Sequence, residues 1–231
     1  MIQPVLQTGD ATASGATTLT IRLDQATSLS DLTEQLIAVT ARLAAETQLT
    51  SVLFVLDEPV QPERTGLSAA DIEEVRRWER AVRRLEQSPA LSVVVVQATC
   101  HGPGADILLA ADYRIAAPKA RLMFAGDDGH LWPGMVFYRL VRQVGQAGVR
   151  RLMVRGATLT ANDALELGVL DELAADAEAV AERVILGASW LSRPELAVRR
   201  QLLHEAVTAE FDDALGVHLA ACDRELRRRD G

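Results

Sequence analysis

The sequence predicts an α/β fold followed by a helical C-terminal region. Strand-like and helix-like stretches alternate through about the first two thirds of the 231 residues, and strands joined by helices usually pair in parallel. Two of the strand candidates, 51–56 and 92–96, are runs of apolar residues typical of strands buried on both faces. After residue 176 only helix-like patterns follow, so we expect that region to pack as helices.

The N-terminal part is expected to hold two strands and two amphipathic helices. Residues 17–23 alternate between polar and apolar side chains, as a strand does, and 51–56 form the second strand. Between them, Ser28 to Ser30 offer caps for a helix over 31–46. A loop with two prolines and a glycine follows, and residues 69–85 predict the second helix. Its expected apolar stripe consists of Ile72, Val75, Trp78, Val82 and Leu85.

The stretch from Leu91 to Ala116 is expected to organise the fold. The buried strand 92–96 leads through a turn at 99–102 into a short apolar helix that begins at Pro103 and ends at Asp112. Proline suits a first helical turn, because its missing N–H would have no partner there. Asp106 is expected in the same turn, where the helix dipole favours a carboxylate. This arrangement either directs backbone N–H groups at an anion or serves tight packing alone.

Shorter elements complete the α/β part. The remaining strands are expected at 113–116, 121–124 and 169–173. A helix after Pro133-Gly134 should be interrupted at Gly145, which separates segments 136–144 and 149–154. Thr160 predicts an N-cap for a helix over 161–167 that Gly168 ends. The last helices include one with Pro194 near its start and one over 212–229.

Composition argues against several classes of protein. With 48% hydrophobic residues, 24% charged residues and a formal net charge of −8, we expect a globular protein that does not bind nucleic acid. No apolar run reaches membrane length, so no membrane span is expected. Cys100 and Cys222 make no disulfide framework, which favours a cytoplasmic location. The sequence shows no metal-ligand spacing and no Walker or G-x-S-x-G motif.

Three segments together resemble the crotonase (enoyl-CoA hydratase/isomerase) superfamily, over about residues 17–175. The first is the glycine motif Gly102-Pro103-Gly104, followed by Asp106, an apolar helix and Asp112. The second is Pro133-Gly134, which matches the Pro-Gly that opens the family's next helix. The third is the family's G…(S/T)A…A…GLV pattern, matched by Gly156, Thr160, Ala161, Ala164, Gly168 and Val169.

The resemblance implies a crotonase-like spiral of ββα units over 1–175 and a helical oligomerisation region over 176–231 that builds trimers or hexamers. It implies a CoA thioester as the substrate, with no metal and no separate cofactor. A backbone N–H of Gly104 or Gly102 would lie near the thioester oxygen, and Leu67 or Ser68, from a fainter motif at 66–71, would supply the other donor. Asp106 would take the place of the family's first catalytic glutamate.

Three positions depart from the family's pattern. Pro103 stands in the middle of the glycine triplet, where the family uses a backbone N–H that proline lacks. Loss of one such donor typically costs about 2.7–4 kcal/mol of transition-state stabilisation. The second catalytic glutamate falls on or near Gly126, which carries no acid. Asp106 is itself one methylene shorter than a glutamate.

Each candidate acid–base group therefore has two interpretations. Asp106 is either a general acid/base, with a pKa raised by an apolar pocket, or a helix-terminal carboxylate only. Asp127 and Asp128 either replace the missing glutamate or form a turn. His130 either faces the acyl pocket or is structural. Cys100 is expected to be a small packing residue.

Within the superfamily, the short chain and the incomplete acid pair most resemble the helper crotonases of dihydroxyphenylglycine biosynthesis. That likeness implies an enzyme of antibiotic biosynthesis with a degenerate active site. It would assist a type III polyketide synthase and a second crotonase in the dehydration and aromatisation of a polyketide-CoA to 3,5-dihydroxyphenylacetyl-CoA. The second hypothesis is a catalytically silent crotonase fold that activates or stabilises another enzyme. The third is an ordinary enoyl-CoA hydratase.

Overall fold

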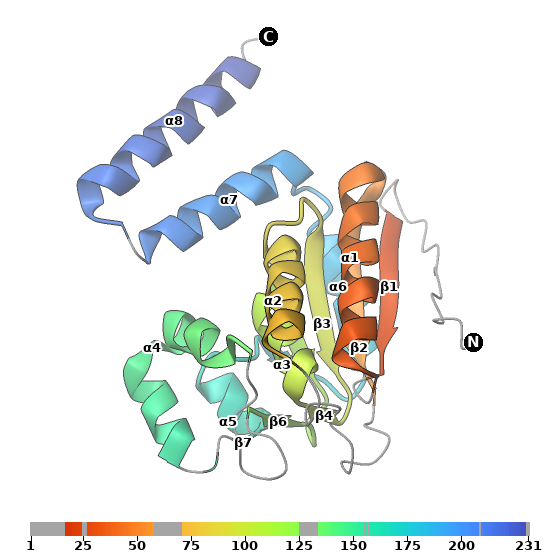
Figure 1. Cartoon of the computed structure of the whole chain (residues 1–231). Coiled ribbons are helices and arrows are strands. Elements are labelled where there is room, and N and C mark those ends of the chain that lie inside the picture. The colour runs from red at the N-terminus through yellow and green to blue at the C-terminus, as the bar shows by residue number, and fades with distance from the viewer. Residues whose placement is uncertain are drawn as a thin grey trace.

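The computed structural model describes residues 17–24, 27–57, 71–124, 134–154, 156, 158–207 and 209–229. Its centre is a five-stranded sheet in the order β1-β2-β3-β5-β8, in which every neighbouring pair is parallel (Figure 1). The strands are β1 (Thr17–Leu23), β2 (Leu49–Leu56), β3 (Leu91–Val96), β5 (Tyr113–Ala116) and β8 (Glu172–Leu173). The predicted α/β fold with a largely parallel sheet is confirmed.

A second, three-stranded sheet lies beside the first and contains β4 (Thr99–Cys100), β6 (Arg121–Met123) and β7 (Thr158–Thr160). Strand β4 pairs with β6 in parallel, and β6 pairs with β7 antiparallel. The sequence analysis did not predict β4 or β7. Both are too short to show a period of two, so no pattern distinguishes them from turns.

Helices cover both faces of the large sheet. Helices α1 (Leu29–Ala45) and α2 (Ile72–Glu86) pack on one face with Phe54 and Leu56, and α6 (Ala177–Gly187) packs on the other with Leu53 and Val55. Successive side chains of a strand point to opposite faces. The apolar run of β2 therefore supplies both cores, as its sequence predicts.

Helix α2 begins later than predicted, and the reason is its N-cap. The Asp71 side chain accepts hydrogen bonds from the backbone N–H groups of Glu73 and Glu74, and the Glu74 carboxylate accepts one from the Asp71 N–H. Ile72 is thus the first helical residue and is 85% exposed, so its assignment to the apolar stripe was wrong. The other four predicted stripe residues are buried: Val75, Trp78, Val82 and Leu85.

Glycines and capping residues set the limits and breaks of the next three helices. These are α3 (Gly102–Ala110), α4 (Val136–Val154) and α5 (Ala161–Glu166). Helix α4 is broken at Gly145, whose φ of 75° and ψ of 160° are not helical. Thr160 caps α5 as predicted. The predicted strand at 169–173 shrinks to β8, because the N–H groups of Val169 and Leu170 bond to the carbonyl of Ala164 and close α5 instead.

The final helices, α7 (Arg193–Ala206) and α8 (Phe211–Arg229), extend from the body in Figure 1. Two arginines fasten α7. Arg193 donates to the carbonyls of Leu43 at 2.6 Å and Glu46 at 2.8 Å, and Arg200 forms an ion pair with Asp112. Across the described part of the chain, no helix is both long and apolar enough to cross a membrane.

Candidate active site

The glycine motif forms the turn between β4 and α3. Gly102 has a φ of 48°, a left-handed conformation that a residue with a Cβ rarely adopts. Pro103 follows in the first turn of α3, and the Gly104 N–H donates to the carbonyl of His101 at 2.9 Å. The turn therefore lies where the sequence predicts it. The N–H of Gly104 already has an acceptor within the turn, the carbonyl of His101.

Asp106 is the fifth residue of α3, because the helix begins at Gly102 and not at Pro103. It consequently lies beyond the first turn, and the expectation that the helix dipole holds it there was wrong. The side chain is 0% exposed. Its Oδ1 accepts from Arg139 Nη1 at 2.7 Å, and its Oδ2 accepts from Trp78 Nε1 at 3.0 Å. A cation and an indole N–H thus hold the carboxylate in place.

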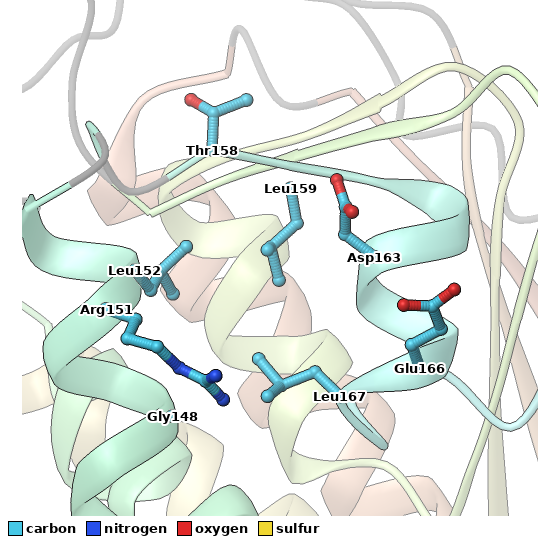
Figure 2. Close-up of a pocket in the computed structure, with 8 residues that line it drawn as sticks. All are labelled: Gly148, Arg151, Leu152, Thr158, Leu159, Asp163, Glu166 and Leu167. Carbon is cyan, nitrogen blue, oxygen red and sulfur yellow. The ribbon is translucent and has the colours of Figure 1, made fainter.

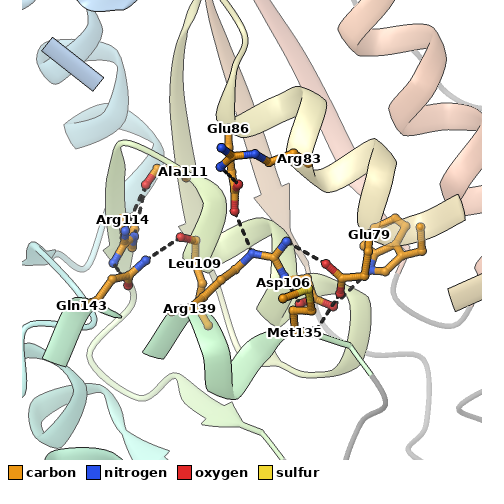
Figure 3. Close-up of polar contacts among 11 residues, drawn as sticks. Glu79, Arg83, Glu86, Asp106, Leu109, Ala111, Arg114, Met135, Arg139 and Gln143 are labelled. Carbon is orange, nitrogen blue, oxygen red and sulfur yellow. Dashed lines mark hydrogen bonds and ion pairs between the residues drawn. The ribbon is translucent and has the colours of Figure 1, made fainter. Parts of the chain in front are cut away.

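Arg139, in the first turn of α4, is the centre of a buried charge cluster (Figure 3). Besides Asp106, its Nη2 contacts Glu79 Oε2 at 2.8 Å and its Nε contacts Glu86 Oε1 at 2.8 Å. Both glutamates lie on α2, so one guanidinium joins α2, α3 and α4. Glu79 also accepts from the Met135 backbone N–H at 2.6 Å.

The electrostatics follow from this geometry. Burial alone would raise the pKa of the Glu86 carboxyl, but hydrogen bonds from Arg139 and Arg83 outweigh it and lower that pKa. Burial alone would lower the pKa of Arg139, and the bonds and charges of the surrounding carboxylates raise it instead. Burial, and then the charge of Asp106, raise the pKa of the Cys100 thiol. Cys100 is fully buried, as expected of a packing residue.

Five of the predicted site residues lie outside the described residues. They are the two candidate oxyanion donors and the three candidate second acid–base groups: Leu67, Ser68, Asp127, Asp128 and His130. Their roles stay predictions. Of the predicted set, the structure brings together Gly102, Gly104 and Asp106 in one turn and helix.

A cavity of about 470 Å³ lies apart from this cluster, between α4, β7 and α5 (Figure 2). Its lining residues are Gly148, Arg151, Leu152, Thr158, Leu159, Asp163, Glu166 and Leu167. None of these was predicted to act in the site, and Asp163 is engaged in capping α5. The Asp106 cluster is therefore the better candidate for the functional centre, because it contains the predicted residues.

The sequence profile of the enoyl-CoA hydratase/isomerase family matches residues 64–227, which is more than half of the chain. The chain belongs to this family.

Individual relatives agree with the family assignment. The chain is 44% identical over 154 residues to an enoyl-CoA-hydratase of Amycolatopsis orientalis, a match that covers 67% of this chain and 71% of the relative. An enoyl-CoA hydratase/isomerase of Cupriavidus metallidurans CH34 superposes with a TM-score of 0.79 at 17% identity, covering 96% of this chain and 89% of that one. A family protein of Silicibacter pomeroyi gives 0.78 at 15% identity, covering 95% and 98%.

The similarities show the fold and the family of this chain. The structural matches have low identity and show the fold, which is the predicted crotonase-like α/β fold. Family membership supports an enoyl-CoA hydratase/isomerase-type function. The narrower assignment to the helper crotonases of dihydroxyphenylglycine biosynthesis is a proposal and is taken up below.

The other members of the cluster around Asp106 and Arg139 were not predicted as site residues. Trp78 was predicted as a core residue, and Glu79, Glu86 and Arg139 were not singled out. One signal was present in the sequence: Glu79 and Glu86 are seven residues apart on α2, which places them along one side of a helix. That spacing gives no hint that Arg139, 53 residues after Glu86, completes the cluster.

Proposed function

We propose that this protein acts on an acyl-CoA thioester in an enoyl-CoA hydratase/isomerase-type reaction, with Asp106 as the group that transfers the proton. The observation that carries the proposal is the position of Asp106 in a member of this family, two residues after the glycine turn on α3. The 44% identical relative from Amycolatopsis orientalis, which is named an enoyl-CoA-hydratase, supports the same reaction class.

The proposed chemistry is the addition of water across a double bond, assisted by proton transfer. In hydration, the oxygen of water bonds to C3 of the 2-enoyl thioester while Asp106 takes the proton of that water, and the electron pair of the double bond moves onto the thioester oxygen. The resulting enolate then takes a proton at C2 from the second acid–base group, which regains one from solvent while Asp106 releases the proton it took, so that H and OH are added across the double bond in total. Dehydration is the reverse. The CoA thioester is the substrate, and this sequence of steps uses no further cofactor.

Backbone N–H groups near the glycine turn are proposed to stabilise the enolate oxygen. Because Pro103 has no N–H and the Gly104 N–H bonds to His101, Gly102 is the better candidate of the two predicted glycines. Leu67 or Ser68 would supply the second donor. Asp127, Asp128 or His130 would supply a second acid–base group.

The test is the hydration of a short 2-enoyl-CoA, followed by the loss of its ultraviolet absorbance. Asp106→Asn should lower kcat about 10²–10⁴-fold, the usual contribution of one acid–base group. Asp57→Asn is the matched control, because it also removes an aspartate paired with an arginine, Arg22 at 3.0 Å, but on the surface. Full activity in Asp106→Asn would refute the role of Asp106.

A second candidate function is favoured by Pro103 and by the burial of Asp106. A site with one oxyanion donor fewer suits a reaction with a strong driving force, such as loss of water to give an aromatic ring. We therefore propose, as the narrower alternative, that the protein assists a type III polyketide synthase, together with a second crotonase, in forming 3,5-dihydroxyphenylacetyl-CoA. A carboxylate that is 0% exposed with both oxygens engaged also fits a silent partner protein.

Product formation by such a synthase, with and without this protein, separates these possibilities. Stimulation by wild type but not by Asp106→Asn would support a catalytic helper. Equal stimulation by both would support a silent partner. No stimulation by either would leave hydration of free acyl-CoA as the function.

Assembly through the C-terminal helices is part of the same proposal. Phe211, Leu215 and Leu219 follow one another at intervals of four on α8 and are exposed in the single chain. Leu215→Glu is expected to reduce the assembled mass, measured by light scattering, if α8 joins copies into a trimer or hexamer. An unchanged mass would refute this role of α8.

A further inference from the structure

Arg139 is nearly as well buried as the carboxylate it contacts, with 7% of its side chain exposed. Its three nitrogens each contact a different acid: Nη1 reaches Asp106, Nη2 reaches Glu79 and Nε reaches Glu86, at 2.7–2.8 Å (Figure 3). These are the short distances of charge-assisted hydrogen bonds. All three nitrogens of the guanidinium therefore form an ion pair at the same time.

The two glutamates have further donors outside the guanidinium. Glu86 is also paired with Arg83 at 2.7 Å, and Glu79 also accepts from the backbone N–H of Met135. Asp106, the deepest of the three acids, combines Arg139 with the neutral N–H of Trp78. Arg139 is thus a cation that directly compensates the charge of Asp106.

The shape of the guanidinium matters as well as its charge. Its N–H groups form a rigid planar fork, whereas a lysine ammonium is a single point of charge on a flexible chain. The fork sets the direction from which Asp106 Oδ1 is contacted, and Trp78 sets the direction at Oδ2. Together they determine the plane of the carboxylate.

We infer that Arg139 is the positioning residue of the reaction: it holds Asp106 ionised and in a fixed plane, so that in the hydration direction Asp106 is ready to take the proton of water. This inference rests on the proposed function of Asp106. It assigns a role to a residue of α4 that was not among the predicted site residues.

The pH dependence follows from the charged and titratable groups around Asp106. Arg139 faces it from α4, Cys100 faces it from β4, and Glu79 and Glu86 on α2 share the guanidinium. Burial of a carboxylate favours its neutral form, and an opposite charge in direct contact favours its ionised form; the contact between Arg139 and Asp106 at 2.7 Å is the one that removal of the arginine would abolish. In wild type, activity that needs the ionised form of Asp106 should therefore persist to low pH. Once the arginine is removed, the same activity should be lost at a higher pH as the pH is lowered.

The first test needs no variant of Arg139. Wild-type protein labelled with ¹³C at the aspartate carboxyls is titrated by NMR, and Asp106→Asn identifies the signal of Asp106. The signal is expected to keep the chemical shift of an ionised carboxylate through the whole pH range of activity. Titration of Asp106 between about pH 5 and 8 would overturn the inference, whether or not any variant of Arg139 folds.

The second test compares the acidic limb of kcat against pH. Arg139→Met should move that limb upward by about 1–3 pH units, and Arg139→Lys should give a smaller shift. Arg142→Met is the control, one turn further along α4, where the side chain donates to the carbonyl of His204 at 3.1 Å. An unshifted limb in a folded Arg139→Met protein would overturn the inference.

The two proposals can fail separately. If Asp106→Asn keeps full activity, the proposed function fails, and the NMR titration still reports whether Asp106 is held ionised. If Asp106→Asn is inactive while Arg139→Met keeps the wild-type limb, the proposed function stands and the positioning role of Arg139 fails.

Discussion

Replacing Arg139 with methionine would leave Glu79, Glu86 and Asp106 close together without the cation that all three contact. Removing one partner of a buried ion pair typically costs about 3–5 kcal/mol, because the charge left behind is neither solvated nor paired. A domain of ordinary stability has only about 5–15 kcal/mol in total. Arg139→Met is therefore expected to lose a large part of its free energy of unfolding at pH 7.

The sign of the pH dependence can be worked out from Glu86. Its pKa is lowered in the folded protein by Arg139 and Arg83, although burial opposes this. In wild type its contribution is present above the unfolded pKa, which is about 4.3, and is lost as the pH falls through the folded value. Without Arg139, burial of the Glu86 carboxyl is opposed by Arg83 alone, so protonation of that carboxyl costs the variant less stability as the pH falls.

Urea unfolding followed by circular dichroism measures both effects. The difference between wild type and Arg139→Met should be about 3–5 kcal/mol at pH 7 and smaller at pH 5. Arg76→Met is the control, because it removes an exposed arginine paired with Glu73 at a spacing of three, which is worth about 0.2–0.5 kcal/mol. A loss below about 1 kcal/mol at pH 7, or a loss that does not change with pH, would refute the account of the cluster.

Three further predictions concern local features. Gly145→Ala places a Cβ at a φ of 75° and should cost about 1–2 kcal/mol; an unchanged unfolding free energy would mean that the break in α4 relaxes. Thr160→Ala removes the cap of α5 and should cost about 1 kcal/mol in the same measurement, whereas Thr158→Ala should not. A maleimide at pH 7 should label Cys222 and spare Cys100 until urea unfolds the chain, because burial and the charge of Asp106 raise the pKa of the Cys100 thiol; mass spectrometry of the native protein that shows labelled Cys100 would contradict this.

Features that depend on neighbouring residues in the chain were predictable from the sequence. The apolar runs of β2 and β3, the break of α4 at Gly145 and the Thr160 cap each follow from side chains within a few residues of one another. The motif around Gly102 and Asp106 also predicted the turn and helix α3, although the helix begins one residue earlier than predicted, at Gly102, and ends at Ala110 instead of Asp112. Errors arose where a cap set the boundary, as at Ile72, which the Asp71 cap leaves exposed at the helix end.

The surroundings of Asp106 were decided by the tertiary structure alone. Trp78 and Arg139, which donate to it, lie 28 and 33 residues away in the chain, on α2 and α4. Whether a carboxylate meets solvent, substrate or an arginine depends on how helices from separate segments pack, and periodicity within one segment carries no information about the next. The sequence therefore determined the family, the fold class and the position of the acid. The packing of α2, α3 and α4 decided that this acid is buried against Arg139, because burying a charge requires a partner that only the assembled helices provide.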